Sequence, residues 1–98
     1  MPYYVYMLRC ADGSFYVGVT NDLERRVAEH NLGIAATSYT HTRRPVTLVH
    51  ASAFREVVQA IAWEKQLKGW RRAKKEALIR GDWEAIRALA RGPSTGSG

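Results

Sequence analysis

Apolar and polar side chains alternate at the start of the chain, first over residues 4–10 and again over residues 14–20. Alternation with a period of two is the pattern of a β-strand whose two faces meet different surroundings. The residues between these runs, Ala11-Asp12-Gly13, favour a tight turn. The pattern therefore predicts an antiparallel β-hairpin.

The length of the turn decides which side chains share a face of the hairpin. A two-residue loop would pair Tyr16 with Arg9 and turn Tyr6 to the opposite face. A three-residue loop that ends at Gly13 pairs Tyr6 with Gly18 and places both tyrosines on one face. Glycine supplies the positive φ that the last position of such a loop requires, which favours the three-residue loop.

A helix is predicted directly after the hairpin. Asn21 is a suitable N-cap, Glu24 three residues later completes a capping-box pattern, and Gly33 is a suitable stop. At about 100° per residue, one sector of this helix holds two apolar and two cationic side chains: Leu23, Val27, Arg26 and His30. An arginine and a histidine therefore flank the stripe that must face the sheet.

The rest of the sequence predicts a long loop, one strand and three helices. The loop is rich in Gly, Ala, Ser and Thr and runs from Asn31 to Pro45. The strand and helices are expected at Val46–Ala51, Glu56–Gly69, Trp70–Arg80 and Asp82–Arg91, before a low-complexity tail over residues 92–98 that is expected to be disordered. We expect a single domain over residues 1–91. Its fold class is α/β of the α+β type, with helices flanking a small, three-stranded, mostly antiparallel sheet.

The charge of the chain favours a polyanionic partner. The formal net charge is +6 and the pI is about 9.9. Six cations fall within eleven residues: Lys65, Lys68, Arg71, Arg72, Lys74 and Lys75. Such clustering is typical of nucleic-acid binding, although charge alone also serves solubility.

The low cysteine content indicates a reducing compartment, which we expect to be the cytoplasm. Cys10 is the single cysteine, so an intramolecular disulfide is excluded and no disulfide-linked partner is expected. The first residues do not have the pattern of a signal peptide, and no apolar run approaches the ~20 residues of a membrane span. One cysteine and three dispersed histidines give no zinc-ligand spacing.

Glu64 falls within the apolar sector of the helix predicted at residues 56–69, beside Val57, Ala60, Ile61 and Leu67. A buried carboxylate requires a partner. One candidate is Lys68, four residues later, and the other is a divalent cation, since Mg²⁺ is often held by one or two carboxylates. The helical pattern alone leaves both alternatives open.

Two tripeptides and three later residues resemble the signature of the GIY-YIG nuclease superfamily. They are Tyr4-Val5-Tyr6, Tyr16-Val17-Gly18, Arg26, His30 and Asn31. The similarity extends through Glu64, covers roughly residues 2–79 and is greatest to short, stand-alone bacterial members. Tyr4 stands where the name of the first motif has glycine, but the tyrosine at its third position, Tyr6, is retained.

This resemblance implies a metal-dependent endonuclease that hydrolyses phosphodiester bonds in DNA and leaves 5′-phosphate and 3′-hydroxyl ends. It implies that Tyr6 activates or orients water, a role that requires nearby cations if the phenolate is to form. Arg26 is expected to stabilise the phosphate, and Tyr16 and His30 to orient the reactants or relay protons. Glu64 is implied as the ligand of one Mg²⁺ or Mn²⁺.

Nucleic-acid contacts are expected from the loop, the helix end before it and the basic run. Hydroxyl, aromatic and arginine side chains together suit phosphate contact and base stacking. The expected binding residues are Asn31, Tyr39, Arg43, Arg44, Lys68, Arg71, Arg72, Lys74 and Lys75. Little sequence preference is expected, with a role in DNA repair or processing. The alternative is a non-catalytic nucleic-acid-binding module, which would need the basic surface but not Tyr6 or Glu64.

Overall fold

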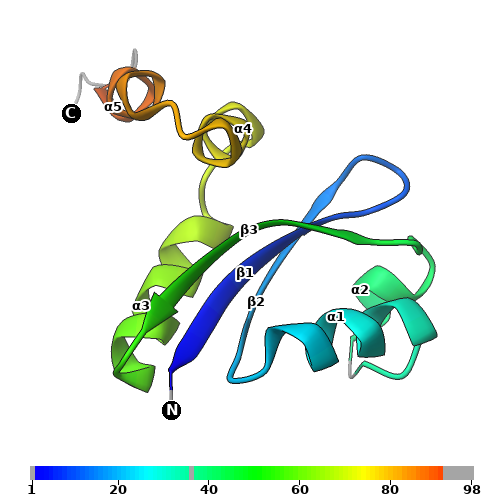
Figure 1. Cartoon of the computed structure of the whole chain (residues 1–98). Helices are drawn as coiled ribbons and strands as arrows, with labels where there is room; N and C mark the ends of the chain where they lie inside the picture. Colours follow the sequence, from blue (N-terminus) through cyan, green and yellow to red (C-terminus); the bar gives the residue numbers. More distant parts are fainter. Residues whose placement is uncertain (1, 36, 92–98) are drawn as a thin grey trace. The chain divides into compact units, whose positions relative to one another are not determined.

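The computed structural model describes residues 2–35 and 37–91 (Figure 1). These residues fall into two compact units, one ending at Lys68 and the other beginning at Gly69. The first unit holds the sheet and three helices, and the second holds two helices.

A three-stranded antiparallel sheet forms the centre of the first unit, as the sequence predicts (Figure 1). Its strands are β1 (Tyr3–Arg9), β2 (Phe15–Thr20) and β3 (Thr47–Phe54), in the order β2-β1-β3. The third strand therefore begins one residue later and ends three residues later than predicted. The central strand β1 is buried on both faces from Val5 to Leu8.

The hairpin has the predicted three-residue loop. Gly13 has a φ of +87°, and the register pairs Tyr6 with Gly18 and Leu8 with Tyr16. The space beside Gly18 is occupied by Tyr6 itself, because a Cβ at position 18 would lie 2.5 Å from the Tyr6 hydroxyl oxygen. Only glycine leaves the Tyr6 side chain room to cross over β2.

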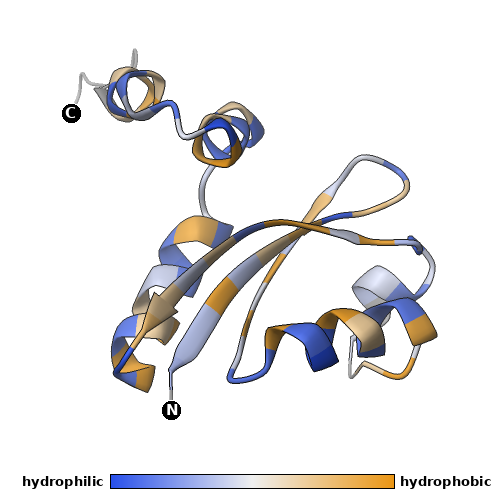
Figure 2. Cartoon of the chain, viewed as in Figure 1, coloured by the Kyte–Doolittle hydropathy of each residue, from blue (hydrophilic) through white to orange (hydrophobic). Residues whose placement is uncertain are grey.

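Helix α1 (Leu23–Leu32) follows the hairpin, but its cap differs from the prediction. Asp22, not Asn21, is the N-cap, and its carboxylate accepts a hydrogen bond from the backbone N–H of Arg25 at 3.1 Å. The helix begins one residue later than the sequence indicated, so Glu24 is too close to the cap to complete a capping box. Gly33 ends the helix in the left-handed conformation, as predicted. Figure 2 shows hydrophilic and hydrophobic stretches alternating along α1.

The segment predicted as a loop contains a short helix, α2 (Ser38–His41), capped by the side chain of Thr37. Serine and threonine suit both loops and caps, which is why composition alone missed this turn of helix. The end of α1 is tied to the start of β3 by Asn31. Its amide nitrogen donates to the carbonyl of Val46 at 3.1 Å, and its amide oxygen accepts from the N–H of Val46 at 2.7 Å.

Helices lie on both faces of the sheet (Figure 1). On one face, Tyr6, Leu8, Cys10 and Val46 form a buried cluster against which Leu23 and Val27 of α1 and the rings of Tyr16 and Tyr39 pack. Helix α3 (Val57–Lys68) contacts all three strands and buries Ala60 and Leu67. Val57 and Ile61, predicted on the same buried face, are 40% and 39% exposed. The buried stripe is therefore rotated away from these two residues, toward positions 60 and 67.

The second unit consists of helices α4 (Arg72–Arg80) and α5 (Trp83–Arg91), which pack on each other. Gly81 separates them in a left-handed conformation, and the Asp82 carboxylate caps α5 by accepting from the N–H of Ala85 at 3.0 Å. Gly81 is the residue between the two predicted helices, and the second of them was predicted to begin at Asp82. The tail predicted to be disordered lies outside the described residues. Among the residues that are described, no helix has the length and apolar character needed to cross a membrane.

The N-cap of α1 gives a test of this local structure. Asp22→Ala should lower the free energy of unfolding by about 1 kcal/mol, because it removes the acceptor for the first helical N–H groups. Asn21→Ala, one residue away, should change stability much less. Chemical denaturation of the two variants measures the difference, and an equal loss in both would contradict the observed helix start.

Candidate active site

Tyr6 lies at the centre of the predicted site. Its side chain comes from the central strand, is 1% exposed, and has its hydroxyl 3.0 Å from Nε2 of His30 on α1. The Tyr16 ring is also close, with centroids 6.3 Å from Tyr6 and 5.1 Å from His30. The hairpin register and the helix period thus bring together three of the predicted catalytic residues.

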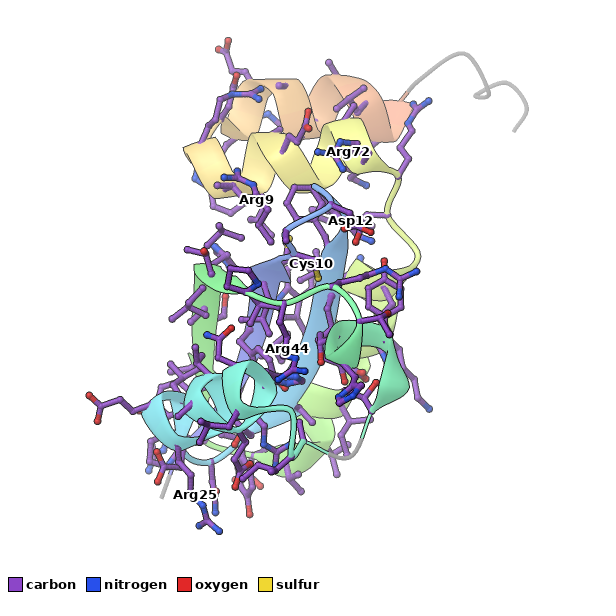
Figure 3. The ribbon with its side chains drawn as sticks, turned by 90° about the vertical axis from the view of Figure 1, so that its right-hand side faces the viewer. Arg9, Cys10, Asp12, Arg25, Arg44 and Arg72 are labelled. Atoms are coloured by element: carbon purple, nitrogen blue, oxygen red, sulfur yellow. The ribbon has the colours of Figure 1, made fainter. Side chains whose placement is uncertain are left out.

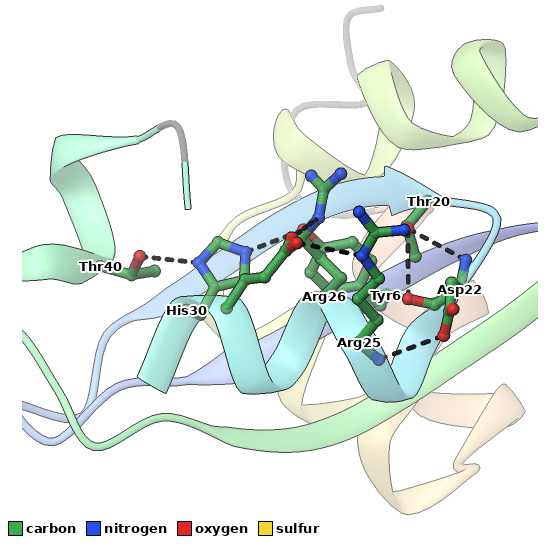
Figure 4. Close-up of polar contacts among 8 residues, drawn as sticks. Tyr6, Thr20, Asp22, Arg25, Arg26, His30 and Thr40 are labelled. Atoms are coloured by element: carbon green, nitrogen blue, oxygen red, sulfur yellow. Dashed lines mark hydrogen bonds and ion pairs between the residues drawn. The ribbon is translucent and has the colours of Figure 1, made fainter. Parts of the chain in front are cut away.

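His30 is held from both sides of its ring (Figure 4). It is 1% exposed, and its Nδ1 lies 2.8 Å from Oγ1 of Thr40 on α2. Burial lowers the pKa of His30, the Arg26 guanidinium lowers it further, and Glu29 acts in the opposite direction. The imidazole is therefore neutral at neutral pH.

Burial raises the pKa of Tyr6 to about 12. The neighbouring Tyr16 adds to this shift, whereas Arg26 opposes it by its charge and by a hydrogen bond. A phenolate would need a shift in the other direction. Tyr6 is therefore a neutral phenol at neutral pH.

Arg26 is near Tyr6, as predicted, but shares its charge with an unpredicted partner (Figure 4). Its Nε lies 3.1 Å from Glu29, and Nε of Arg25 lies 3.2 Å from the other oxygen of the same carboxylate. Arg26 is 40% exposed and Glu29 is 25% exposed. The carboxylate offsets part of the positive charge that would otherwise favour a phenolate at Tyr6.

Tyr39 and Arg43 lie between Tyr16 and the hairpin turn. The Tyr39 ring lies 5.9 Å from that of Tyr16, and the guanidinium of Arg43 lies over Tyr39 at 4.1 Å. Arg43 also pairs with Asp12 at 3.0 Å and donates to the carbonyl of Tyr39 at 2.8 Å. Tyr39 and Arg43 thus have internal partners, and their contact with nucleic acid stays a prediction.

Glu64 is 13% exposed and pairs with Lys68 at 2.7 Å, the first of the two partners considered from the sequence. The hydrogen bond to Glu64 raises the pKa of Lys68, and the Tyr16 phenol contributes to the same shift. Helix α3 also contacts β1 and β2, the strands that carry Tyr6 and Tyr16. In this way α3 is linked to the site around Tyr6.

The other predicted binding residues lie in two places. Asn31 binds the backbone of Val46, and Arg44 donates to the carbonyls of His41 and Asn31. Figure 3 shows Arg44 close to the chain that follows α1, whereas Arg25 extends outward from that helix. The remaining four, Arg71, Arg72, Lys74 and Lys75, belong to the second unit, where Arg72 pairs with Glu76 and Lys74 lies over Trp70.

Two residues of the site were missed from the sequence. Glu29 could have been found, since it stands three residues after Arg26 and four after Arg25, the spacings at which side chains meet on a helix. Thr40 gave no signal, because it lies in a segment whose composition predicted a loop. Its position depends on how α2 packs against α1.

Alkaline titration tests the environment of Tyr6. A folded pKa of about 12, above the ordinary value of 10, means that the native state holds the phenolic proton more tightly than the unfolded state does. This contribution to stability is complete below pH 10 and is lost as the pH rises toward 12. Denaturation across this range should show a steeper loss of stability in the wild type than in Tyr6→Phe. Tyr3→Phe, on the same strand, is the control, and equal slopes in wild type and Tyr6→Phe would contradict the shift.

The sequence matches one family model and several curated relatives. The model of the GIY-YIG catalytic domain matches residues 2–77. A UPF0213 protein of Halobacterium salinarum is 47% identical over 77 residues, which cover 79% of this chain and 99% of that protein. A UPF0213 protein of Bacillus pumilus is 46% identical, covering 79% of this chain and 78% of the relative.

Two solved structures are similar in fold. The solution NMR structure of a UPF0213 protein from Bacillus halodurans has a TM-score of 0.53 and is 40% identical in sequence. The match covers 95% of this chain and 89% of that protein's chain. The solution NMR structure of a protein from E. faecalis has a TM-score of 0.58 and is 38% identical. That match covers 83% of this chain and 85% of the other. With a family model that matches most of the sequence and with these relatives, the chain belongs to the GIY-YIG family and resembles its small UPF0213 members.

Proposed function

We propose that this protein is an endonuclease that uses one Mg²⁺ or Mn²⁺ to hydrolyse phosphodiester bonds of DNA. The observation that carries the proposal is the buried contact between Tyr6 and His30, 3.0 Å apart, within a chain that matches the catalytic domain of a nuclease family. A purely structural domain would have no need for a buried phenol and imidazole with a half-exposed guanidinium beside them.

The residues of the chain itself divide the chemistry between them. Tyr6 orients the attacking water and receives its proton, since its hydroxyl is held in place by His30. Arg26 binds the phosphate through its planar guanidinium, which matches the geometry of phosphate oxygens. Tyr16 and His30, whose ring centroids lie 5.1 Å apart, orient the water and the phosphate or relay protons.

Glu64 is compatible with a metal site that has a single carboxylate as its protein ligand. No group of three or more His, Cys, Asp or Glu side chains that could hold an ion occurs within residues 2–35 and 37–91. Mg²⁺ does not require one, because it is commonly held by one or two carboxylates together with waters and substrate phosphate. When bound by Glu64, the ion supplies positive charge that offsets the negative charge developing on the leaving 3′ oxygen.

The binding of DNA rests in this proposal on phosphate contacts. The net charge is +6, which favours contact with the phosphate backbone. Affinity from phosphate contacts carries little sequence information and falls steeply with salt. Low sequence preference follows from phosphate contacts, and the role that we propose for such an activity is in DNA repair or processing.

Cleavage of labelled DNA tests the proposed chemistry. Tyr6→Phe and Glu64→Gln should each reduce cutting roughly 100-fold or more, because they remove the proton acceptor and the metal ligand. Binding of DNA, followed by fluorescence anisotropy in EDTA, should change little. Glu24→Gln on the exposed side of α1 is the control and should cut at the wild-type rate.

Lys68→Met separates a metal ligand from a simple ion pair at Glu64. If Glu64 serves only to hold Lys68, this variant should lose as much activity as Glu64→Gln, with an unchanged metal requirement. We expect instead that only Glu64→Gln raises the concentration of Mg²⁺ needed for half-maximal cutting. Binding without cutting by the wild type, in either metal and on single-stranded, duplex and branched DNA, would favour the non-catalytic binding module.

The salt dependence of binding tests the basic run of the second unit. Arg71, Arg72, Lys74 and Lys75 are changed together to glutamine, which removes the charge but suits a helix. The slope of log affinity against log salt should become shallower by up to about 0.9 for each phosphate that the variant no longer neutralises. Circular dichroism controls for the helices, and an unchanged slope in a folded variant would assign phosphate binding to other cations.

A further inference from the structure

Thr40 is a buried polar side chain that the proposed chemistry leaves without a role. It is 1% exposed and its Oγ1 lies 2.8 Å from Nδ1 of His30. The other ring nitrogen of His30, Nε2, faces the Tyr6 hydroxyl at 3.0 Å. The imidazole is therefore placed between two hydroxyl groups, one from α2 and one from β1 (Figure 4).

The position of one proton decides what this arrangement can do. A neutral imidazole has one N–H, and its other nitrogen is an acceptor. If Nδ1 carries the proton, it donates to Thr40, and the lone pair of Nε2 accepts the Tyr6 hydroxyl. If Nε2 carries the proton, the Thr40 hydroxyl donates to Nδ1 instead, Nε2–H points at the Tyr6 oxygen, and His30 cannot accept a proton from Tyr6. The hydrogen bond of Arg26 to Tyr6 favours the first tautomer, because a guanidinium only donates and the Tyr6 O–H is then left to donate to Nε2.

We propose that Thr40 is a positioning residue that fixes His30 in the tautomer with the proton on Nδ1, so that Nε2 takes the phenolic proton of Tyr6 during catalysis. This inference rests on the proposed hydrolysis of a phosphodiester. Thr40 acts through His30, as the carboxylate of a catalytic triad acts through its histidine.

The proton transfer balances without a free phenolate. As the water oxygen bonds to phosphorus, one water O–H bond breaks and its proton moves to the Tyr6 oxygen. The original Tyr6 proton moves to Nε2, which makes His30 an imidazolium, while the bond from phosphorus to the 3′ oxygen breaks and that oxygen keeps the electron pair. Tyr6 ends neutral, which accords with a phenol whose pKa is raised to about 12 by burial.

A threonine suits this position better than a carboxylate in the charge environment of His30. The titratable or charged groups that influence or face the ring are Tyr6, Tyr16, Arg26 and Glu29. Burial and Arg26 lower the pKa of His30, so the ring starts neutral and ready to accept a proton. A carboxylate at position 40 would favour the imidazolium before the reaction, whereas a hydroxyl orients the ring without adding charge.

The first measurement is the ¹⁵N NMR spectrum of His30 in the full-length protein, with its signals identified by their loss in His30→Gln. A proton-bearing Nδ1 and a proton-free Nε2 are expected at neutral pH. The reverse assignment in the wild type would overturn the proposal, whether or not any variant folds and whether or not DNA is cut.

Cleavage kinetics of Thr40→Val and Thr40→Ser give the second measurement. Valine keeps the shape but removes the hydroxyl, so kcat should fall roughly tenfold or more with KM nearly unchanged, and the two tautomers should mix. Serine restores the hydroxyl and should recover kcat to within a few-fold. Wild-type kcat in a folded Thr40→Val, or equal losses in both variants, would overturn the role of the Thr40 hydroxyl. A wild type that cuts no DNA would overturn the proposed function, while the tautomer is still decided by NMR.

Discussion

The contact of Tyr6 with the backbone of Gly18 is the constraint on which the rest of the site depends. A Cβ at position 18 would lie 2.5 Å from the Tyr6 hydroxyl oxygen, so the phenol has its place only because β2 carries a glycine there. The loop that ends at Gly13 sets the register that makes these two residues partners. From this position the hydroxyl reaches His30 on α1. A change of register by one residue would turn Tyr6 to the other face of the sheet and break that contact.

Paired charges surround this contact, and they decide the protonation of the groups inside it. Arg26 pairs with Glu29 and Lys68 pairs with Glu64, so both of these cations near the two tyrosines have a carboxylate beside them. Arg26 pulls the pKa of Tyr6 down but does not overcome burial, which raises it to about 12. The free protein therefore holds a neutral phenol against a neutral imidazole.

Features that depend on short sequence separation could be predicted, and those that depend on packing could not. The turn at Gly13 fixed the pairing of Tyr6 with Gly18 by rules of loop length, so the sheet and its tyrosine face followed from local sequence. The cap of α1 was placed one residue early because Asn21 and Asp22 are both good caps. Thr40 could not be found, since its contact with His30 depends on the way two helices meet.

Burial of Tyr6 sets a condition on how a substrate can reach it. The inner groups, Tyr6, His30 and Thr40, are each 1% exposed, so in the proposed reaction the attacking water would reach the phenol only if a covering side chain moved. Arg26 both hydrogen-bonds to Tyr6 and is 40% exposed, so in the proposed reaction it is open to a phosphate that approaches from solvent. In the proposed reaction, a phosphate that takes Arg26 from Glu29 would also free the Tyr6 hydroxyl for water. Binding of the substrate and activation of the nucleophile would then be one event, because the same guanidinium takes part in both.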